Sequence, residues 1–148
     1  YWSNEDHWQW ATKPNPREKA SFIKENILPM QDSGHLKFIQ GRELPFDIFY
    51  ASGHTDKMMI PKIQYNGYTV CYMADLLPST GHIPLPYVMG YDTRPLLTLE
   101  EKERFLNEAA DKQYVLFLEH DAVNECCTVK RTEKGIRLDR TFPLSELG

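Results

Sequence analysis

Residues 47–77 of this chain read DIFYASGHTDKMMIPKIQYNGYTVCYMADLL. The stretch alternates short runs of β-branched and aromatic residues with loops, a pattern typical of strands in a sheet. Asn66-Gly67 separates two of these runs, Met58–Tyr65 and Tyr68–Ala74. Because both residues tolerate positive φ, the dipeptide predicts a two-residue hairpin turn. We therefore expect three strands, the last two joined as a β-hairpin.

Side chains that can bind metal ions follow three of the expected strands. His54 follows the strand Ile48–Tyr50, Asp75 closes the second hairpin strand, and His120 follows the continuous apolar strand Tyr114–Leu118. Imidazole and carboxylate are the usual ligands of zinc and related ions, and a catalytic site takes its ligands from separate elements. The pattern indicates a metal site that contains His54, Asp75 and His120.

Each of these residues also has an ordinary structural interpretation. A loop histidine such as His54 is more often not a ligand, and His120 could be a surface residue beside Glu119 and Asp121. Asp75 is the stronger case, because a carboxylate that closes an apolar strand needs a compensating partner. The nearby acids that could orient ligating imidazoles from an outer shell are Asp56, Glu119 and Asp121.

Three motifs occur in order: Gly53-His54-Thr55, then Ala74-Asp75-Leu76 after the hairpin, then Leu118-Glu119-His120-Asp121. Together, over roughly residues 46–140, they resemble the second half of a metallo-β-lactamase superfamily hydrolase. The resemblance implies that His54 binds a first metal ion, that Asp75 is the catalytic carboxylate bridging two ions, and that His120 binds the second. It also implies an α/β (α+β) fold, half of an αβ/βα sandwich with a mixed or antiparallel sheet covered by helices.

The family's first-half motif, H-x-H-x-D-H, is absent from this chain. The nearest string is Trp2–His7, in which Trp2 and Asn4 stand where the motif has its leading histidines. We therefore expect the chain to be a C-terminal half that begins just after the missing motif. Its inner sheet face would be an exposed apolar surface, which soluble monomers avoid. The expected partner is the missing N-terminal half or a second copy of this chain.

The resemblance implies a metal-dependent hydrolase that acts on a small molecule. Metal-bound hydroxide would attack an ester, thioester, lactone or amide, with one or two zinc ions in the complete fold and Fe or Mn as alternatives. This fragment alone is expected to bind metal weakly or not at all, and to be inactive by itself. The alternative function is a non-catalytic binding or assembly module that retains the half-fold.

Length and composition agree with one soluble domain. The 148 residues are expected to form a single domain, with a helical lead-in over 1–30 and a sheet plus helix over 36–148. A net charge of −4 gives no reason to expect nucleic acid or an anionic membrane as partner. No targeting segment is recognised, which slightly favours the cytoplasm. Three cysteines are too few for a disulfide framework, and we expect buried thiols.

Capping residues predict where the helices begin. Ser3 is expected to cap a short helix over 3–11, Asn15 a second helix, and Thr98, with Glu101, a third through a capping box. The irregular stretch 77–97 precedes this last helix, and we expect it to form the rim of the active site. Its candidates for substrate contacts are His82, Tyr87, Tyr91 and Asp92.

Overall fold

A computed structural model describes residues 1–148, which divide into two compact units, 1–44 and 45–148. The expectation of a single domain stays a prediction. The first unit holds one parallel strand pair and two helices, namely β1 (Trp2–Ser3), α1 (Glu5–Thr12), α2 (Lys24–Asp32) and β2 (Lys37–Phe38).

The helices of the first unit begin at other residues than the sequence predicts. Asn4, not Ser3, caps α1, because its Oδ1 accepts a hydrogen bond of 2.7 Å from the backbone N–H of His7. Asn15 also accepts hydrogen bonds from two following backbone amides, but it caps only a turn. The second helix begins later, at Lys24. Of the two predicted caps in this unit, Asn15 does accept hydrogen bonds from the backbone, but no helix follows it directly.

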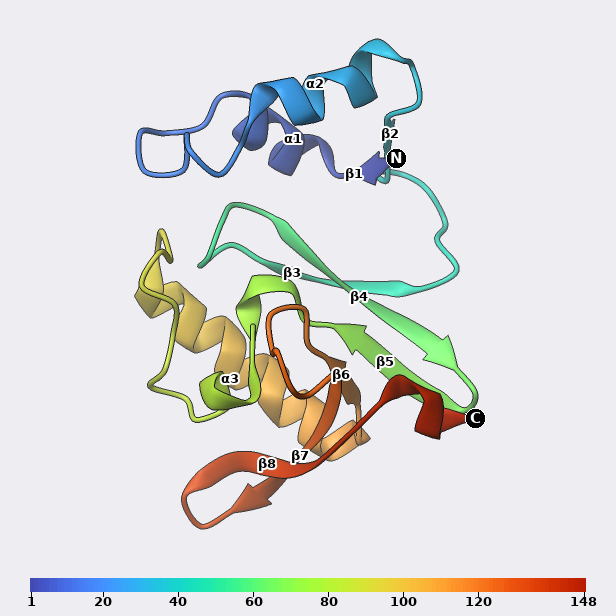
Figure 1. Ribbon diagram of the computed structural model, residues 1–148, viewed down its shortest axis with the longest axis vertical. Coiled ribbons are helices and arrows are strands. Elements are labelled where there is room, and N and C mark those ends of the chain that lie inside the picture. Colours follow the sequence, from blue (N-terminus) through green and yellow to red (C-terminus); the bar gives the residue numbers. More distant parts are fainter. The chain divides into compact units, whose positions relative to one another are not determined.

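The second unit is built on a six-stranded mixed sheet with the strand order β3-β4-β5-β6-β7-β8 (Figure 1). All neighbouring strands are antiparallel except β5 and β6, which are parallel. The strands are β3 (Asp47–Ala51), β4 (Met58–Tyr65), β5 (Tyr68–Tyr72), β6 (Val115–Phe117), β7 (Cys126–Thr132) and β8 (Gly135–Phe142). The mixed sheet with covering helices agrees with the fold class expected from the sequence.

The predicted hairpin is confirmed at its turn. Asn66 and Gly67 have φ values of 48° and 82°, and Tyr65 pairs with Tyr68 across the strands. Positive φ at both central residues is the requirement of the type I′ turn that suits the twist of two paired strands. The hairpin β4–β5 and the second hairpin β7–β8 are thus placed as the turn residues indicate.

The parallel pair β5–β6 requires a crossover, which consists of the segment 73–94 and the helix α3 (Pro95–Lys112). The helix begins at Pro95 rather than Thr98, with proline at the favoured first position. The predicted capping box is therefore wrong. Thr98 lies in the first turn, and Glu101 binds a different segment of the chain, as described below.

One face of the sheet packs against α3 and forms the main core. Phe105, Leu106 and Ala109 of α3 are buried in one cluster with Ile60, Cys71 and Leu116 of the sheet, and Figure 1 shows the helix running across this face. A smaller cluster forms on the opposite face from Val115, Cys126, Phe142 and Leu147. All three cysteines are buried and unbridged, as expected. No helix in the structure is both long and apolar enough to cross a bilayer.

Candidate metal centre

His54, Asp75 and His120 lie close together at one edge of the sheet. Because β3 and β5 are each antiparallel to β4, they run in the same direction, and β6 is parallel to β5. The segments that follow β3, β5 and β6 therefore leave the sheet at the same edge. These segments carry the three residues that the sequence singled out.

Asp75 lies between the two histidines. Its Oδ2 is 3.3 Å from Nε2 of His54, and its Oδ1 is 3.2 Å from Nε2 of His120. The contact with His120 does not have hydrogen-bond geometry, so Oδ1 is a buried oxygen without a hydrogen-bond donor. Asp75 itself lies in a short 3₁₀ turn, Ala74–Leu76, which begins with a positive φ of 44° at Ala74. The strand ends before Asp75 rather than at it.

The other ring nitrogen of His54 is held by a second carboxylate. Asp92 Oδ1 lies 2.8 Å from Nδ1 of His54, and Asp92 is only 4% exposed. Burial lowers the pKa of His54, but its hydrogen bonds with Asp75 and Asp92 outweigh burial and raise the pKa to about 9. The hydrogen bond with His54 in turn lowers the pKa of Asp75, against the effect of burial. A carboxylate on Nδ1 leaves Nε2 of His54 facing Asp75.

The loop that carries His54 is fixed by α3. Glu101 accepts hydrogen bonds of 2.8 and 3.0 Å from the N–H of Ser52 and one of 2.9 Å from the N–H of Gly53. Gly53 lies directly against the first turn of the helix, where a Cβ atom would overlap the backbone of Thr98. Arg94 donates to the carbonyl of Ser52 at 2.5 Å. The backbone on the N-terminal side of His54 therefore has little freedom to move.

The donor set suits metal ions of the zinc type. Bonds of about 2.0–2.2 Å at tetrahedral angles separate neighbouring ligand atoms by roughly 3.3–3.5 Å, close to the 3.2 and 3.3 Å between the imidazole nitrogens and the Asp75 oxygens. The buried Oδ1 without a donor is also an atom that a cation would satisfy. The two imidazoles face different oxygens, and no three His, Cys, Asp or Glu side chains converge on one ion position. The three residues therefore fit an arrangement in which the Asp75 carboxylate lies between two metal ions. Each ion would need further ligands.

A cavity of about 350 Å³ opens beside His120. Of the expected rim residues, His82 and Tyr91 line it, whereas Tyr87 does not. The side chain of Tyr87 is 61% exposed, and its carbonyl accepts a hydrogen bond from Lys102. The residues lining the cavity are Pro78, Ser79, His82, Val88, Met89, Gly90, Tyr91 and His120.

The candidate outer-shell acids have other partners. Asp56 forms an ion pair of 3.0 Å with Arg94, and Asp121 binds the backbone and hydroxyl of Thr80. The acid that does orient His54 is Asp92, which sequence reasoning assigned to substrate contacts. No sequence signal links Asp92 to His54 or Glu101 to the loop before it, because these pairs are 38 and 48–49 residues apart.

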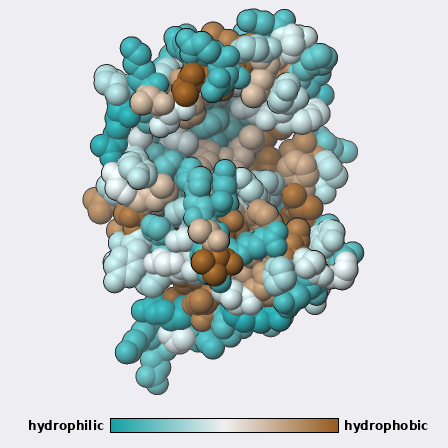
Figure 2. Space-filling view, viewed as in Figure 1, coloured by the Kyte–Doolittle hydropathy of each residue, from teal (hydrophilic) through white to brown (hydrophobic).

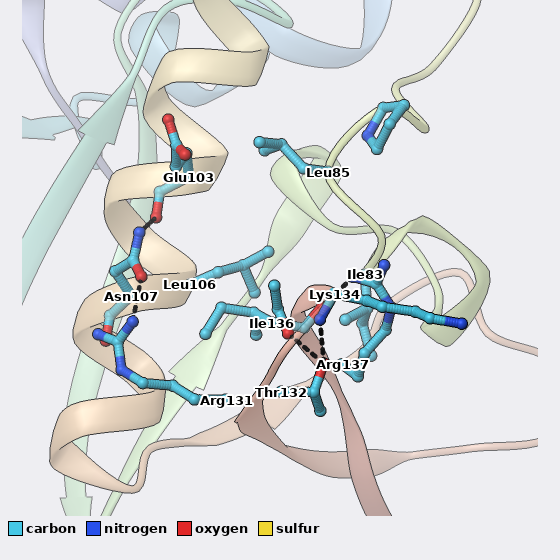
Figure 3. A pocket seen from close by; sticks show the side chains of 12 residues that line it. Ile83, Leu85, Glu103, Leu106, Asn107, Arg131, Thr132, Lys134, Ile136 and Arg137 are labelled. Atoms are coloured by element: carbon cyan, nitrogen blue, oxygen red, sulfur yellow. Dashed lines mark hydrogen bonds between the residues drawn. The ribbon is translucent and has the colours of Figure 1, made fainter.

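A separate cavity of about 380 Å³ lies between α3, the hairpin β7–β8 and the segment 83–86 (Figure 3). Its wall includes Ile83, Leu106 and Ile136, and Figure 3 shows Arg131 joined to Asn107 of the helix by a hydrogen bond of 2.7 Å. None of the three candidate metal ligands lines this cavity.

Comparison with family models finds no match, and comparison with curated proteins finds none either. Solved structures do match. A probable metal-dependent hydrolase from Staphylococcus aureus aligns with a TM-score of 0.78 at 23% identity, over 96% of this chain and 53% of the other. AbOPH, a hydrolase of the beta-lactamase superfamily, aligns with a TM-score of 0.77 at 14% identity, over 96% of this chain and 55% of that structure.

A third match is AidC, a dizinc quorum-quenching lactonase in complex with a product. It aligns with a TM-score of 0.72 at 20% identity, over 96% of this chain and 55% of that one. The chain thus spans about half the length of the structures that it matches. At these identities the likeness shows the fold alone: this chain has half of a metallo-β-lactamase-like fold.

Proposed function

We propose that this chain is one half of a zinc-dependent hydrolase that cleaves an ester, thioester, lactone or amide of a small molecule. The observation that carries the proposal is the placement of Asp75 between Nε2 of His54 and Nε2 of His120, at 3.3 and 3.2 Å. The structural neighbours described as a metal-dependent hydrolase and a dizinc lactonase support the same chemistry.

The residues of this chain have separate tasks in the proposed site. His54 and His120 would each hold one ion, and the Asp75 carboxylate between them would hold both. Asp92 fixes the ring of His54 by accepting a hydrogen bond from Nδ1, which keeps Nε2 directed at the metal. The chemistry that zinc would supply at these residues is a bound water acidic enough to provide hydroxide near neutral pH, with electrostatic stabilisation of the developing oxyanion.

The remaining ligands have to come from a partner, which we propose is a complementary half-fold, supplied by another polypeptide segment or by a second copy of this chain. The sheet face opposite α3 supports this. Tyr50, Ile63, Tyr65 and Tyr68 on this face remain 40–43% exposed. On the side of the molecule seen in Figure 2, hydrophobic residues lie among hydrophilic ones. Large exposed side chains gathered on one face of a sheet often mark an interface.

Light scattering tests the partner proposal. At micromolar concentration the purified chain should form a dimer or a complex with its complementary half, and Tyr65→Ser together with Tyr68→Ser should weaken that association at least tenfold. As a control, Tyr87→Ser changes an exposed tyrosine that lies outside the sheet. A stable monomer that recruits no complementary half would contradict the proposal.

Activity of the native assembly tests the reaction. The assembly that contains this chain would be loaded with Zn²⁺ and offered a p-nitrophenyl ester, a thioester, a lactone and a phosphodiester. We expect hydrolysis of at least one carbonyl substrate, and loss of that activity by more than 100-fold in Asp75→Asn. A zinc-loaded assembly that hydrolyses none of them would favour the non-catalytic binding module instead.

A further inference from the structure

A short 3₁₀ turn, Thr80–His82, is tied to the segment that carries His120. Asp121 Oδ2 accepts hydrogen bonds from the backbone N–H of Thr80 at 2.9 Å and from its hydroxyl at 2.8 Å. The backbone N–H of His120 donates to the carbonyl of Pro78 at 3.2 Å. The turn and the candidate ligand His120 are therefore held in one position relative to each other.

The same turn is anchored from the other side by a lysine of α3. Lys102 is 1% exposed, and its ammonium donates to the carbonyls of His82, Pro84 and Tyr87 at 3.0, 3.3 and 2.6 Å. Burial lowers the pKa of Lys102 to about 8. An ammonium has three donors, so these three carbonyls use its full capacity. The backbone of His82 is thus fixed by a buried group that has no alternative partner.

The ring of His82 is oriented by a neighbouring hydroxyl. Ser79 Oγ lies 2.9 Å from Nδ1 of His82, and the side chain of His82 makes no other hydrogen bond in the structure. Burial, together with the positive charge of Lys102, lowers the pKa of His82, so the ring is neutral at neutral pH. When the hydroxyl of Ser79 donates to Nδ1, the single ring proton lies on Nε2. The ring then carries one N–H donor without a partner.

His82 and His120 line the same cavity of about 350 Å³. We propose that Nε2–H of His82 is a hydrogen-bond donor to an oxygen of the substrate's ester-type group in this cavity, which the candidate metal ligand His120 also lines. The proposal rests on the proposed hydrolase function and adds a catalytic residue to it. A donor fixed before the substrate arrives stabilises charge that develops on an oxygen without having to reorganise, and removal of one such donor lowers kcat by about 100–1000-fold.

Two substitutions of His82 distinguish the loss of its N–H donor from the loss of its imidazole ring. In the zinc-loaded native assembly, His82→Ala should lower kcat about 100-fold or more with little change in zinc content. His82→Gln places an amide N–H near the position of Nε2 and should recover at least tenfold of that loss. Tyr87→Ala is the matched control, since it changes the same segment without touching the cavity. Unchanged kcat in His82→Ala would overturn the role of His82 while leaving the hydrolase function intact.

Nitrogen NMR of the 148-residue chain gives a readout that does not depend on activity. At pH 7 we expect His82 to be neutral with its proton on Nε2, and Ser79→Ala should allow both tautomers. A proton on Nδ1 in the wild-type chain would overturn the proposal. A wild-type assembly that binds zinc but hydrolyses no substrate would remove the proposed function, and with it the role of His82.

Discussion

Gly53 lies so close to Thr98 that a single added Cβ atom would overlap the backbone nitrogen and the Cα atom of the threonine. The contact joins the loop that carries His54 to the first turn of α3. The φ angle of Gly53 is not in the left-handed region. Glycine is therefore required at this position because there is no space for a side chain, and not because of the backbone conformation. The glycine of the G-H-T motif is therefore required by packing against α3.

Gly53→Ala should destabilise the protein by about 2–3 kcal/mol, because the helix or the loop has to move to admit the methyl group. Chemical denaturation measures the loss. Gly90→Ala is the control, since a Cβ at that position meets no atom within 4 Å. Equal unfolding free energies of the two variants would show that the loop accommodates the added methyl group without loss of stability.

Glu101→Ala should cost about 2–3 kcal/mol, because it leaves the backbone N–H groups of Ser52 and Gly53 without their acceptor. Hydrogen exchange at these two amides should accelerate more than exchange in β6, which reports on the whole unit. Glu103→Ala is the matched control on the same helix, because the Glu103 side chain is exposed. If exchange rises uniformly, Glu101 supports the fold in general and not this loop.

Asp92→Asn should weaken zinc binding by about 10–100-fold, the usual effect of removing a carboxylate that orients a ligating imidazole. Asparagine is nearly isosteric, so the stability of the zinc-free chain should change far less than the affinity. Competition with a coloured chelator measures the affinity, and Asp139→Asn, on an exposed carboxylate of β8, is the control. Equal affinities in both variants would show that Asp92 has no part in holding the metal.

Glu108 should make the unfolding free energy of the protein depend on pH in the acidic range. Its hydrogen bond from Lys112, together with that from Tyr114, lowers its pKa to about 2, although partial burial opposes the shift. Since the folded pKa lies below the unfolded value, this stabilisation is full above pH 4.5 and is lost as the pH falls towards 2. Glu108→Gln should flatten the decline of unfolding free energy over this range by on the order of 1 kcal/mol, given partial solvent screening. An unchanged slope would exclude Glu108 as its source.

Local signals in the sequence placed much of the sheet. Asn66-Gly67 marks the hairpin because the turn itself requires positive φ, and the apolar run before His120 marks a buried strand because both of its faces are covered. The order of the strands then brings His54, Asp75 and His120 to one edge. Each of these inferences needed only neighbouring residues and the direction of the strands.

Long-range contacts could not be predicted in the same way. The spacing of Thr98 and Glu101 fits a capping box, but the carboxylate binds amides of residues 52 and 53 instead, and the helix begins at Pro95. The sequence predicts that Asp92 is a rim residue, whereas in the structure it contacts His54. The sequence does not indicate that Lys102 is buried, because a lysine on an amphipathic helix is usually solvated. In each case the partner lies many residues away.

The most direct test follows the imidazole nitrogens of His54 and His120 by NMR while Zn²⁺ is added to the native assembly that contains the 148-residue chain. We predict that zinc shifts Nε2 of both rings, and that Asp75→Asn abolishes both shifts. His35, an exposed histidine of the other unit, serves as the internal control. Zinc that shifts neither ring, or that shifts both equally well in Asp75→Asn, would contradict a metal centre built around Asp75.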